Sequence, residues 1–178
     1  MTSIDICVDV QNAFTRGPLA PKGAGSLCRR IADRLERSET FVVFTVDDHT
    51  EKIGKYEKEQ YGEHCNKYTD LMIDKIVEGA AKKKAIVTKS TFTPDKGKLF
   101  EAMWRGGKGL PETINVYGLL TDVCVLNIAL MLRNELPNTE IVVIEDLCLG
   151  SSLKKHNEAI SILESNSVKI GRCFVKKE

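Results

Sequence analysis

The sequence lacks an excess of charge of either sign, and it lacks long apolar runs. Its 26 basic and 25 acidic residues nearly cancel, which argues against the strongly basic surface of a nucleic-acid-binding protein. No apolar run is long enough to cross a bilayer, and the opening segment "MTSIDICVDV" has no signal-peptide pattern. We therefore expect a cytoplasmic protein whose partner is neither nucleic acid nor a membrane.

Cys-x-x-Cys pairs, internal repeats and low-complexity tracts are also absent. The six cysteines stand apart, at positions 7, 28, 65, 124, 148 and 173. In a reducing compartment, isolated thiols of this kind usually pack as small apolar side chains. A chain of 178 residues is long enough to bury a substantial core without disulfides. We expect a single domain over 1–178.

Six short runs rich in β-branched residues are present, with helical patterns between them. The runs are continuously apolar, which is typical of parallel strands covered on both faces. We expect strands over 4–10, 41–46, 85–88, 114–118, 141–146 and 167–175, and helices over 23–38, 97–105, 121–135 and 152–165. This alternation predicts an α/β fold with three α/β/α layers around a six-stranded, mostly parallel, Rossmann-like sheet.

Ionisable and nucleophilic residues follow four of these strands. Asp9 closes the first strand, and Asp47 and His49 follow the second. Lys89 follows the third strand directly, and Cys124 comes soon after the fourth. Ligands of an open parallel sheet bind beyond the carboxyl ends of its strands, so we expect these side chains to meet at one edge. Each alone has a simpler explanation, since an aspartate often caps a turn and a lysine is usually solvated.

Together, these residues form the set that a cysteine hydrolase needs. Cys124 would lie in the first turn of a helix, where the partial positive charge favours a thiolate, and the Lys89 ammonium would favour it further. Asp9, if partly desolvated, could accept the thiol proton and later protonate a leaving amine. Backbone N–H groups from Leu120 to Cys124 would be the natural donors to an oxyanion.

The polar segment 47–70 is long for a connection and carries a second candidate site. Asp47 and His49 stand two residues apart, so their side chains can point the same way in an extended segment, and Glu57 and His64 follow later. Two imidazoles with carboxylates suit a divalent zinc, iron or manganese ion. The alternative is a polar surface loop whose two histidines are unrelated.

These motifs together resemble the isochorismatase-like cysteine hydrolases, and within them the nicotinamidases. The resemblance rests on "CVDVQNAF", "FTVDDH", "YGEHC", "VTKSTF", "GLLTDVCV" and "IEDLCLGSSLKKHNEAISIL". It implies that Asp9, Lys89 and Cys124 are the catalytic residues. It also implies a cis peptide between Leu119 and Leu120, with the Leu120 and Cys124 amides as the oxyanion hole.

The resemblance further implies a metal site and a pair of substrate-binding aromatics. The metal ligands would be Asp47, His49, Glu57 and His64, with zinc as the first choice of ion and iron or manganese as alternatives. Phe14 and Tyr61 would flank the ring of the substrate. Glu59 lies close to Glu57 in the sequence and competes with it for the role of ligand. The prolines usual before "HC" and the glycines usual after it are missing here, so this loop is expected to run differently.

The sequence therefore predicts a metal-dependent amidohydrolase that acts on a small amide, with nicotinamide as the first candidate. An enzyme with the same triad that hydrolyses a carbamoyl or ureido compound is the second candidate. A catalytically silent binding protein on the same fold is the third. Relatives are commonly oligomeric, so a homo-oligomer is also implied, although nothing in the sequence locates an interface.

Overall fold

A six-stranded parallel sheet forms the centre of the computed structural model, which describes residues 2–107 and 109–173. The strand order is β3-β2-β1-β4-β5-β6. The strands are β1 (Ser3–Val8), β2 (Phe41–Asp47), β3 (Lys84–Lys89), β4 (Thr113–Leu119), β5 (Glu140–Leu149) and β6 (Lys169–Gly171). All six expected strands are present. The expected strand over 167–175 is shorter, and its last two residues lie outside the described part of the chain.

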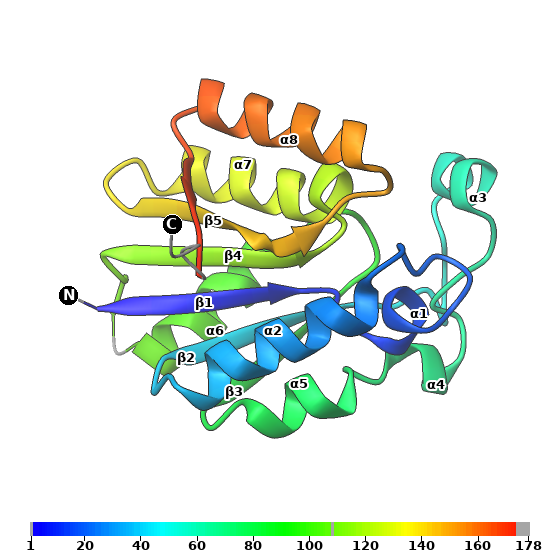
Figure 1. Cartoon of the computed structure of the whole chain (residues 1–178), viewed down its shortest axis with the longest axis horizontal. Coiled ribbons are helices and arrows are strands. Elements are labelled where there is room, and N and C mark those ends of the chain that lie inside the picture. The colour runs from blue at the N-terminus through cyan, green and yellow to red at the C-terminus, as the bar shows by residue number, and fades with distance from the viewer. Residues whose placement is uncertain (1, 108, 174–178) are drawn as a thin grey trace.

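Helices cover both faces of the sheet, as right-handed crossovers require. In Figure 1, α2 (Ala24–Glu36) lies in front of the sheet beside α5 (Lys75–Ala80), and α6 (Lys96–Gly107) lies behind it. Two further helices, α7 (Leu126–Glu135) and α8 (Leu153–Ser165), pack on β5 and β6. The predicted three-layer α/β/α fold is therefore confirmed. No helix in the described residues is long and apolar enough to span a membrane.

The burial of each element follows its sequence pattern. Every residue of β1 except the first is buried, and α2 buries its apolar face, which includes Leu27, Ile31 and Leu35. The edge strand β3 differs from the expectation of burial on both faces, because Lys84, Ile86 and Thr88 are exposed. An edge strand has only one neighbour, so the helices cover it less completely.

Two short helices form in the polar segment that the sequence suggested was a long connection. They are α3 (Lys55–Tyr61) and α4 (Tyr68–Leu71), and a further short helix, α1 (Asn12–Thr15), follows β1. Neither α3 nor α4 contains a fully buried residue. The segment therefore has local helical structure but contributes little to the core.

The helix expected over 121–135 is divided in two. Its first turn is a π-helical turn, η1 (Thr121–Val125), and α7 continues from Leu126. Such turns are rare and occur often at functional sites. Cys124 lies within this turn.

The strand order reverses between β1 and β4, because β2 and β3 extend the sheet on one side of β1 and β4, β5 and β6 extend it on the other. Gly118 in β4 allows these two strands to approach closely. It has a φ of 129°, and an added Cβ would lie 2.1 Å from the Val8 carbonyl oxygen. Ligands bind at such a reversal in open α/β sheets.

Candidate active site

The register of the parallel strands brings the predicted catalytic residues together. Asp47 and Lys89 are direct partners at the ends of β2 and β3. Val8 pairs with Thr45 on one side and with Gly118 on the other, so Asp9 emerges between β2 and β4. Residues that are distant in sequence therefore share one edge of the sheet, as predicted.

Lys89 lies at the centre of this cluster. Its Nζ is 2.8 Å from Asp9 Oδ2, 2.9 Å from Asp47 Oδ1 and 3.5 Å from Cys124 Sγ. The side chain of Lys89 is only 1% exposed. Burial opposes its charge, but the neighbouring negative groups outweigh burial and raise the pKa of Lys89 well above its ordinary value. Lys89 is therefore a fixed ammonium that contacts both Asp9 and Cys124.

Asp9 is fully buried and held in a fixed orientation. Its backbone has a φ of 50°, in the left-handed region that few non-glycine residues adopt. Thr45 Oγ1 donates a hydrogen bond of 2.7 Å to Asp9 Oδ1. Burial raises the pKa of Asp9, and the nearby charge of Lys89 opposes that rise. The expected desolvation of this carboxyl and the upward direction of its pKa are therefore confirmed, and its role in proton transfer stays a prediction.

Cys124 differs from the expected thiolate. Burial, followed by the charge of Asp9, raises the pKa of the Cys124 thiol well above its ordinary value, although Lys89 lowers it. The expectation that the helix terminus and the ammonium would produce a thiolate is therefore wrong for the isolated protein. Desolvation of a thiol surrounded by carboxylates outweighs one nearby ammonium. Burial beside Asp9 therefore favours the neutral thiol form of Cys124 over the thiolate.

The peptide between Leu119 and Leu120 is cis, as the resemblance implied. It leads directly into η1, and Leu120 and Cys124 line the same pocket. The Leu120 carbonyl accepts hydrogen bonds of 3.1 Å from the Val123 and Val125 amides, which closes the turn. The proposed oxyanion donors therefore belong to one compact turn beside the sulfur.

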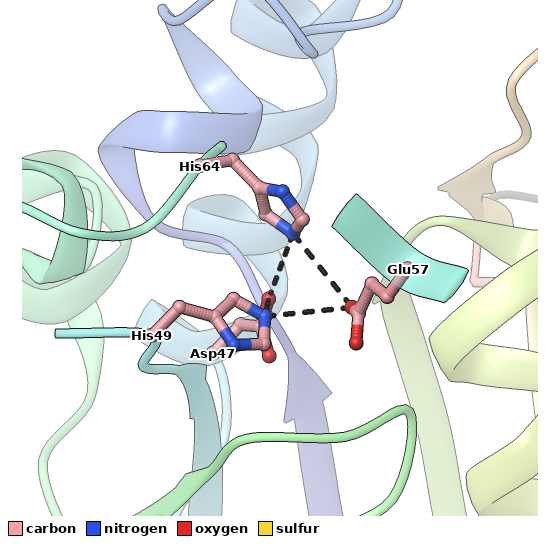
Figure 2. A group of neighbouring side chains, drawn as sticks. All are labelled: Asp47, His49, Glu57 and His64. Atoms are coloured by element: carbon pink, nitrogen blue, oxygen red, sulfur yellow. Dashed lines mark ion pairs between the residues drawn. The ribbon is translucent and has the colours of Figure 1, made fainter. Parts of the chain in front are cut away.

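The second predicted cluster also forms. Asp47, His49, Glu57 and His64 each offer one ligand atom, and these atoms all lie within 4.8 Å of one another. Figure 2 shows the two imidazoles and the Glu57 carboxylate converging on the Asp47 carboxylate. His49 Nε2 is 3.1 Å from Asp47 Oδ2 and 3.4 Å from Glu57 Oε1. Glu59 does not join this group, because it is exposed and pairs with Lys55 at 4.0 Å.

The hydrogen bonds of the imidazoles test whether this group suits a cation. His49 Nδ1 lies 3.2 Å from the Lys52 carbonyl, and His64 Nδ1 lies 3.0 Å from the Gly62 carbonyl. A carbonyl can only accept, so each Nδ1 carries a proton, and in its neutral form each imidazole would present the Nε2 lone pair toward the carboxylates. The His49 Nε2 atom is buried and makes no hydrogen bond of acceptable geometry. Lone pairs and carboxylates directed at one point fit a divalent metal ion.

Asp47 belongs to both clusters. Its Oδ1 accepts from Lys89, and its Oδ2 faces the two imidazoles. Burial opposes ionisation of this carboxyl, but the imidazoles of His49 and His64 and the charge of Lys89 hold its pKa well below the usual range. One carboxylate therefore connects the candidate metal centre to the candidate triad.

A pocket of about 290 Å³ opens above both clusters. Phe14 and Tyr61 line it, and their ring centroids lie 6.1 Å and 6.3 Å from that of His64. Much of the remaining lining is apolar and includes Leu19, Pro21 and Val123, and Ser151 adds a hydroxyl. Among the described residues that line the pocket, Asp47, Glu57 and His64 are the only ionisable side chains besides Tyr61 and Cys124, and there is no lysine or arginine.

Sequence reasoning missed three residues of the site. Phe92 lines the pocket and packs edge-on against Tyr61, with ring centroids 6.4 Å apart. Thr45 fixes Asp9, and Gln11 is a fully buried amide beside Asp47. Phe92 had a usable signal, since it is an aromatic that closely follows a strand end at the functional edge. Thr45 and Gln11 had none beyond their position near the strand ends.

Comparison with known proteins agrees with this geometry. A sequence profile of the isochorismatase domain matches residues 3–171, so the chain belongs to the isochorismatase family. No curated protein matches the chain at a significant level.

Several solved structures share the fold along nearly their whole length. A nicotinamidase/pyrazinamidase from Bacillus subtilis is 21% identical, with a TM-score of 0.79, and the match covers 97% of this chain and 100% of that one. The pyrazinamidase of Pyrococcus horikoshii, solved in complex with zinc, is 18% identical, with a TM-score of 0.79 and coverage of 97% and 99%. The N-carbamoylsarcosine amidase of Thermoplasma acidophilum is 20% identical, with a TM-score of 0.78 and coverage of 99% and 100%.

Proposed function

We propose that the chain is a metal-dependent cysteine amidohydrolase that converts nicotinamide and water to nicotinate and ammonia. The observation that carries this proposal is the position of Lys89 Nζ, within 3.5 Å of both Asp9 and Cys124. Cys124 in turn lines a pocket that also opens onto the histidine–carboxylate cluster. The names of the similar solved structures include nicotinamidases and a zinc-bound pyrazinamidase, which supports the choice of substrate and of ion.

The cation would be held by Asp47, His49, Glu57 and His64, and zinc is the ion we propose for a site of two imidazoles and two carboxylates. When bound, a zinc ion is a Lewis acid that can take a ring nitrogen as a ligand and so orient the substrate. Phe14 and Tyr61 would then lie along the faces of the ring.

Acylation begins with the protonated thiol. Asp9 takes the proton from Cys124 as the sulfur forms a bond to the carboxamide carbon. The carbonyl π electrons move to oxygen, and the Leu120 and Cys124 amides stabilise the resulting oxyanion. Asp9 then returns the proton to the departing nitrogen, the C–N bond breaks, and ammonia leaves an acyl thioester on Cys124. Lys89 contacts both Asp9 and the Cys124 sulfur and holds them in position during these steps.

Deacylation uses the same groups, with water in place of the thiol as the nucleophile. Asp9, again a carboxylate, removes a proton from a water molecule as that water attacks the thioester carbon. The second tetrahedral species collapses, the C–S bond breaks, and the sulfur recovers the proton from Asp9. The product is an acid, which ionises on release. The mechanism therefore needs Asp9 to change its protonation state easily, which agrees with its raised pKa.

The charge of the pocket favours this substrate over the second candidate. Nicotinamide is neutral, whereas a carbamoylated amino acid such as N-carbamoylsarcosine carries a carboxylate. The lining offers that carboxylate no lysine or arginine, and it already contains the carboxylates of Asp47 and Glu57. Unpaired burial of a further anion would be costly. The third candidate, a silent binding protein, gives no reason for Lys89, Asp9 and Cys124 to be buried in contact.

An ammonia-release assay tests the proposal. The purified protein is incubated with nicotinamide, pyrazinamide and N-carbamoylsarcosine, with and without a strong chelator. We expect release from the two ring amides only, and loss of activity with the chelator. Cys124→Ala should abolish turnover without loss of bound metal, whereas Cys28→Ala, a buried cysteine in α2, should retain activity. Turnover by Cys124→Ala, or full activity in chelator, would show that the proposed mechanism is wrong.

A further inference from the structure

Gln11 is a fully buried polar residue that the proposed mechanism does not use. It follows Asp9 by two residues at the end of β1, has no exposed surface, and does not line the pocket. A buried amide of this kind must satisfy its donors and its acceptor inside the protein. Its hydrogen-bond partners therefore indicate what it does.

The Gln11 side chain holds the backbone of Asp47 from both sides. Its Oε1 accepts a hydrogen bond of 2.7 Å from the Asp47 N–H, and its Nε2 donates one of 2.9 Å to the Asp47 carbonyl. The same Nε2 also donates to the Asp70 carbonyl at 3.1 Å and to Cys65 Sγ at 3.4 Å. Two N–H hydrogens thus serve three acceptors, so the amide cannot rotate without losing several bonds.

These partners belong to the segments that carry the candidate metal ligands. Asp47 is itself a ligand of the cluster, and Cys65 directly follows His64. The Cys65 carbonyl accepts a hydrogen bond of 2.9 Å from the His49 N–H. Gln11 therefore contacts the strand end that carries Asp47 and the residue that connects His49 with His64.

We propose that Gln11 is a positioning residue for the metal site, which it preorganises by fixing the Asp47 backbone against the loop that carries His64. The inference rests on the proposed metal-binding function. Partners of this kind orient the ligands rather than binding the ion, and their loss typically costs about 10–100-fold in metal affinity. The site would still be present without Gln11, but its ligands would have to be ordered when the ion binds.

The test compares Gln11→Ala with Asn12→Ala. Asn12 is the neighbouring residue, and its amide donates one hydrogen bond of 2.9 Å to the Thr69 carbonyl without contacting Asp47. Both variants lose an amide that binds the segment following His64, but only one loses contact with the metal-ligand strand. Zinc affinity is measured on the metal-free proteins by competition with a chromogenic chelator. We expect Gln11→Ala to bind zinc about 10–100-fold more weakly, and Asn12→Ala to bind like the unchanged protein.

Thermal unfolding separates positioning from general stability. A residue with only a structural role would lower the midpoint equally with and without zinc, whereas a positioning residue would also reduce the zinc-dependent rise, because that rise follows the affinity. If Gln11→Ala does not fold, Gln11→Met keeps most of the volume and removes the hydrogen bonds. Normal zinc affinity in the Gln11 variant, or an equal loss of affinity in Asn12→Ala, would overturn this inference but leave the proposed metal function intact. Failure of the unchanged protein to bind zinc would overturn the proposed metal function as well.

Discussion

Replacing Lys89 by methionine tests whether one ammonium stabilises the edge of the sheet. The substitution keeps a long unbranched side chain but removes the ammonium that contacts both the Asp9 and Asp47 carboxylates, which lie 2.8 Å and 2.9 Å from Nζ. All three side chains are at most 2% exposed. Without the ammonium, two carboxylates would face each other in a desolvated site.

The magnitude follows from the burial of this group. Removing one partner of a buried ion pair typically costs about 3–5 kcal/mol, because the remaining charge is left uncompensated. An unfolding entropy of ~2.1 cal/mol/K per residue, over 178 residues, gives ~0.37 kcal/mol/K. The midpoint of thermal unfolding should therefore fall by ~8–13 °C in Lys89→Met.

The assay is thermal unfolding followed by circular dichroism, in chelator so that no cation compensates Asp47. Lys82→Met is the matched control, since it breaks an exposed pair with Glu39 and should hardly change the midpoint. Combining Lys89→Met with Asp9→Asn should cost less than the sum of the single changes, because the second change removes one of the uncompensated charges. A midpoint in Lys89→Met as high as that of Lys82→Met would refute the reasoning.

Three further predictions concern the metal ligands, His156 and the close approach of β1 and β4. Glu57→Gln should weaken zinc binding by at least ~10-fold in chelator competition, whereas Glu59→Gln should not; equal effects would contradict the ligand assignment. Burial lowers the pKa of His156, so the unfolded chain binds its proton first, and stability in urea should fall as the pH drops below about 6.5. His156→Gln should make that fall shallower, and an unchanged slope would argue against this assignment. Gly118→Ala would place a Cβ 2.1 Å from the Val8 carbonyl oxygen at a φ of 129°, so little folded protein is expected, and a normal yield with a native spectrum would contradict the close approach.

The parts of the site that depend on sheet topology were predictable from the sequence. Parallel strands present their carboxyl ends at one edge, so residues that follow successive strands must be neighbours. This rule placed Asp9, Asp47 and Lys89 correctly without knowledge of the strand order. The residue types suggested that His49 and His64 share a metal site but left an unrelated surface loop as the alternative, and the resemblance favoured the shared site.

The parts that depend on weakly buried segments were not predictable. The helix α3 contains no fully buried residue, so its sequence has no apolar stripe from which a helix could be inferred. That helix nevertheless carries Glu57 and Tyr61 to the pocket. Its position follows from tertiary contacts around the metal ligands rather than from a local pattern.

The protonation of Cys124 shows a different limit of prediction from the sequence. The sequence identified two influences that favour a thiolate, the ammonium and the helix terminus, and both are local. The influence that dominates is burial beside two carboxylates, which depends on packing from several elements. The same holds for Gln11, whose role lies entirely in contacts with distant segments.

The charge of the combined clusters connects these observations with the proposed metal. Asp9, Asp47 and Glu57 contribute three carboxylates within one connected group, and Lys89 contributes one ammonium. With neutral imidazoles, two negative charges remain in a site that is nearly shielded from solvent. Burying uncompensated charge is costly, so such a group gains most from a bound divalent cation or from proton uptake. A cation at the His49–His64 end would meet this requirement and leave Lys89 to Asp9 and Cys124, where the proposed chemistry needs it.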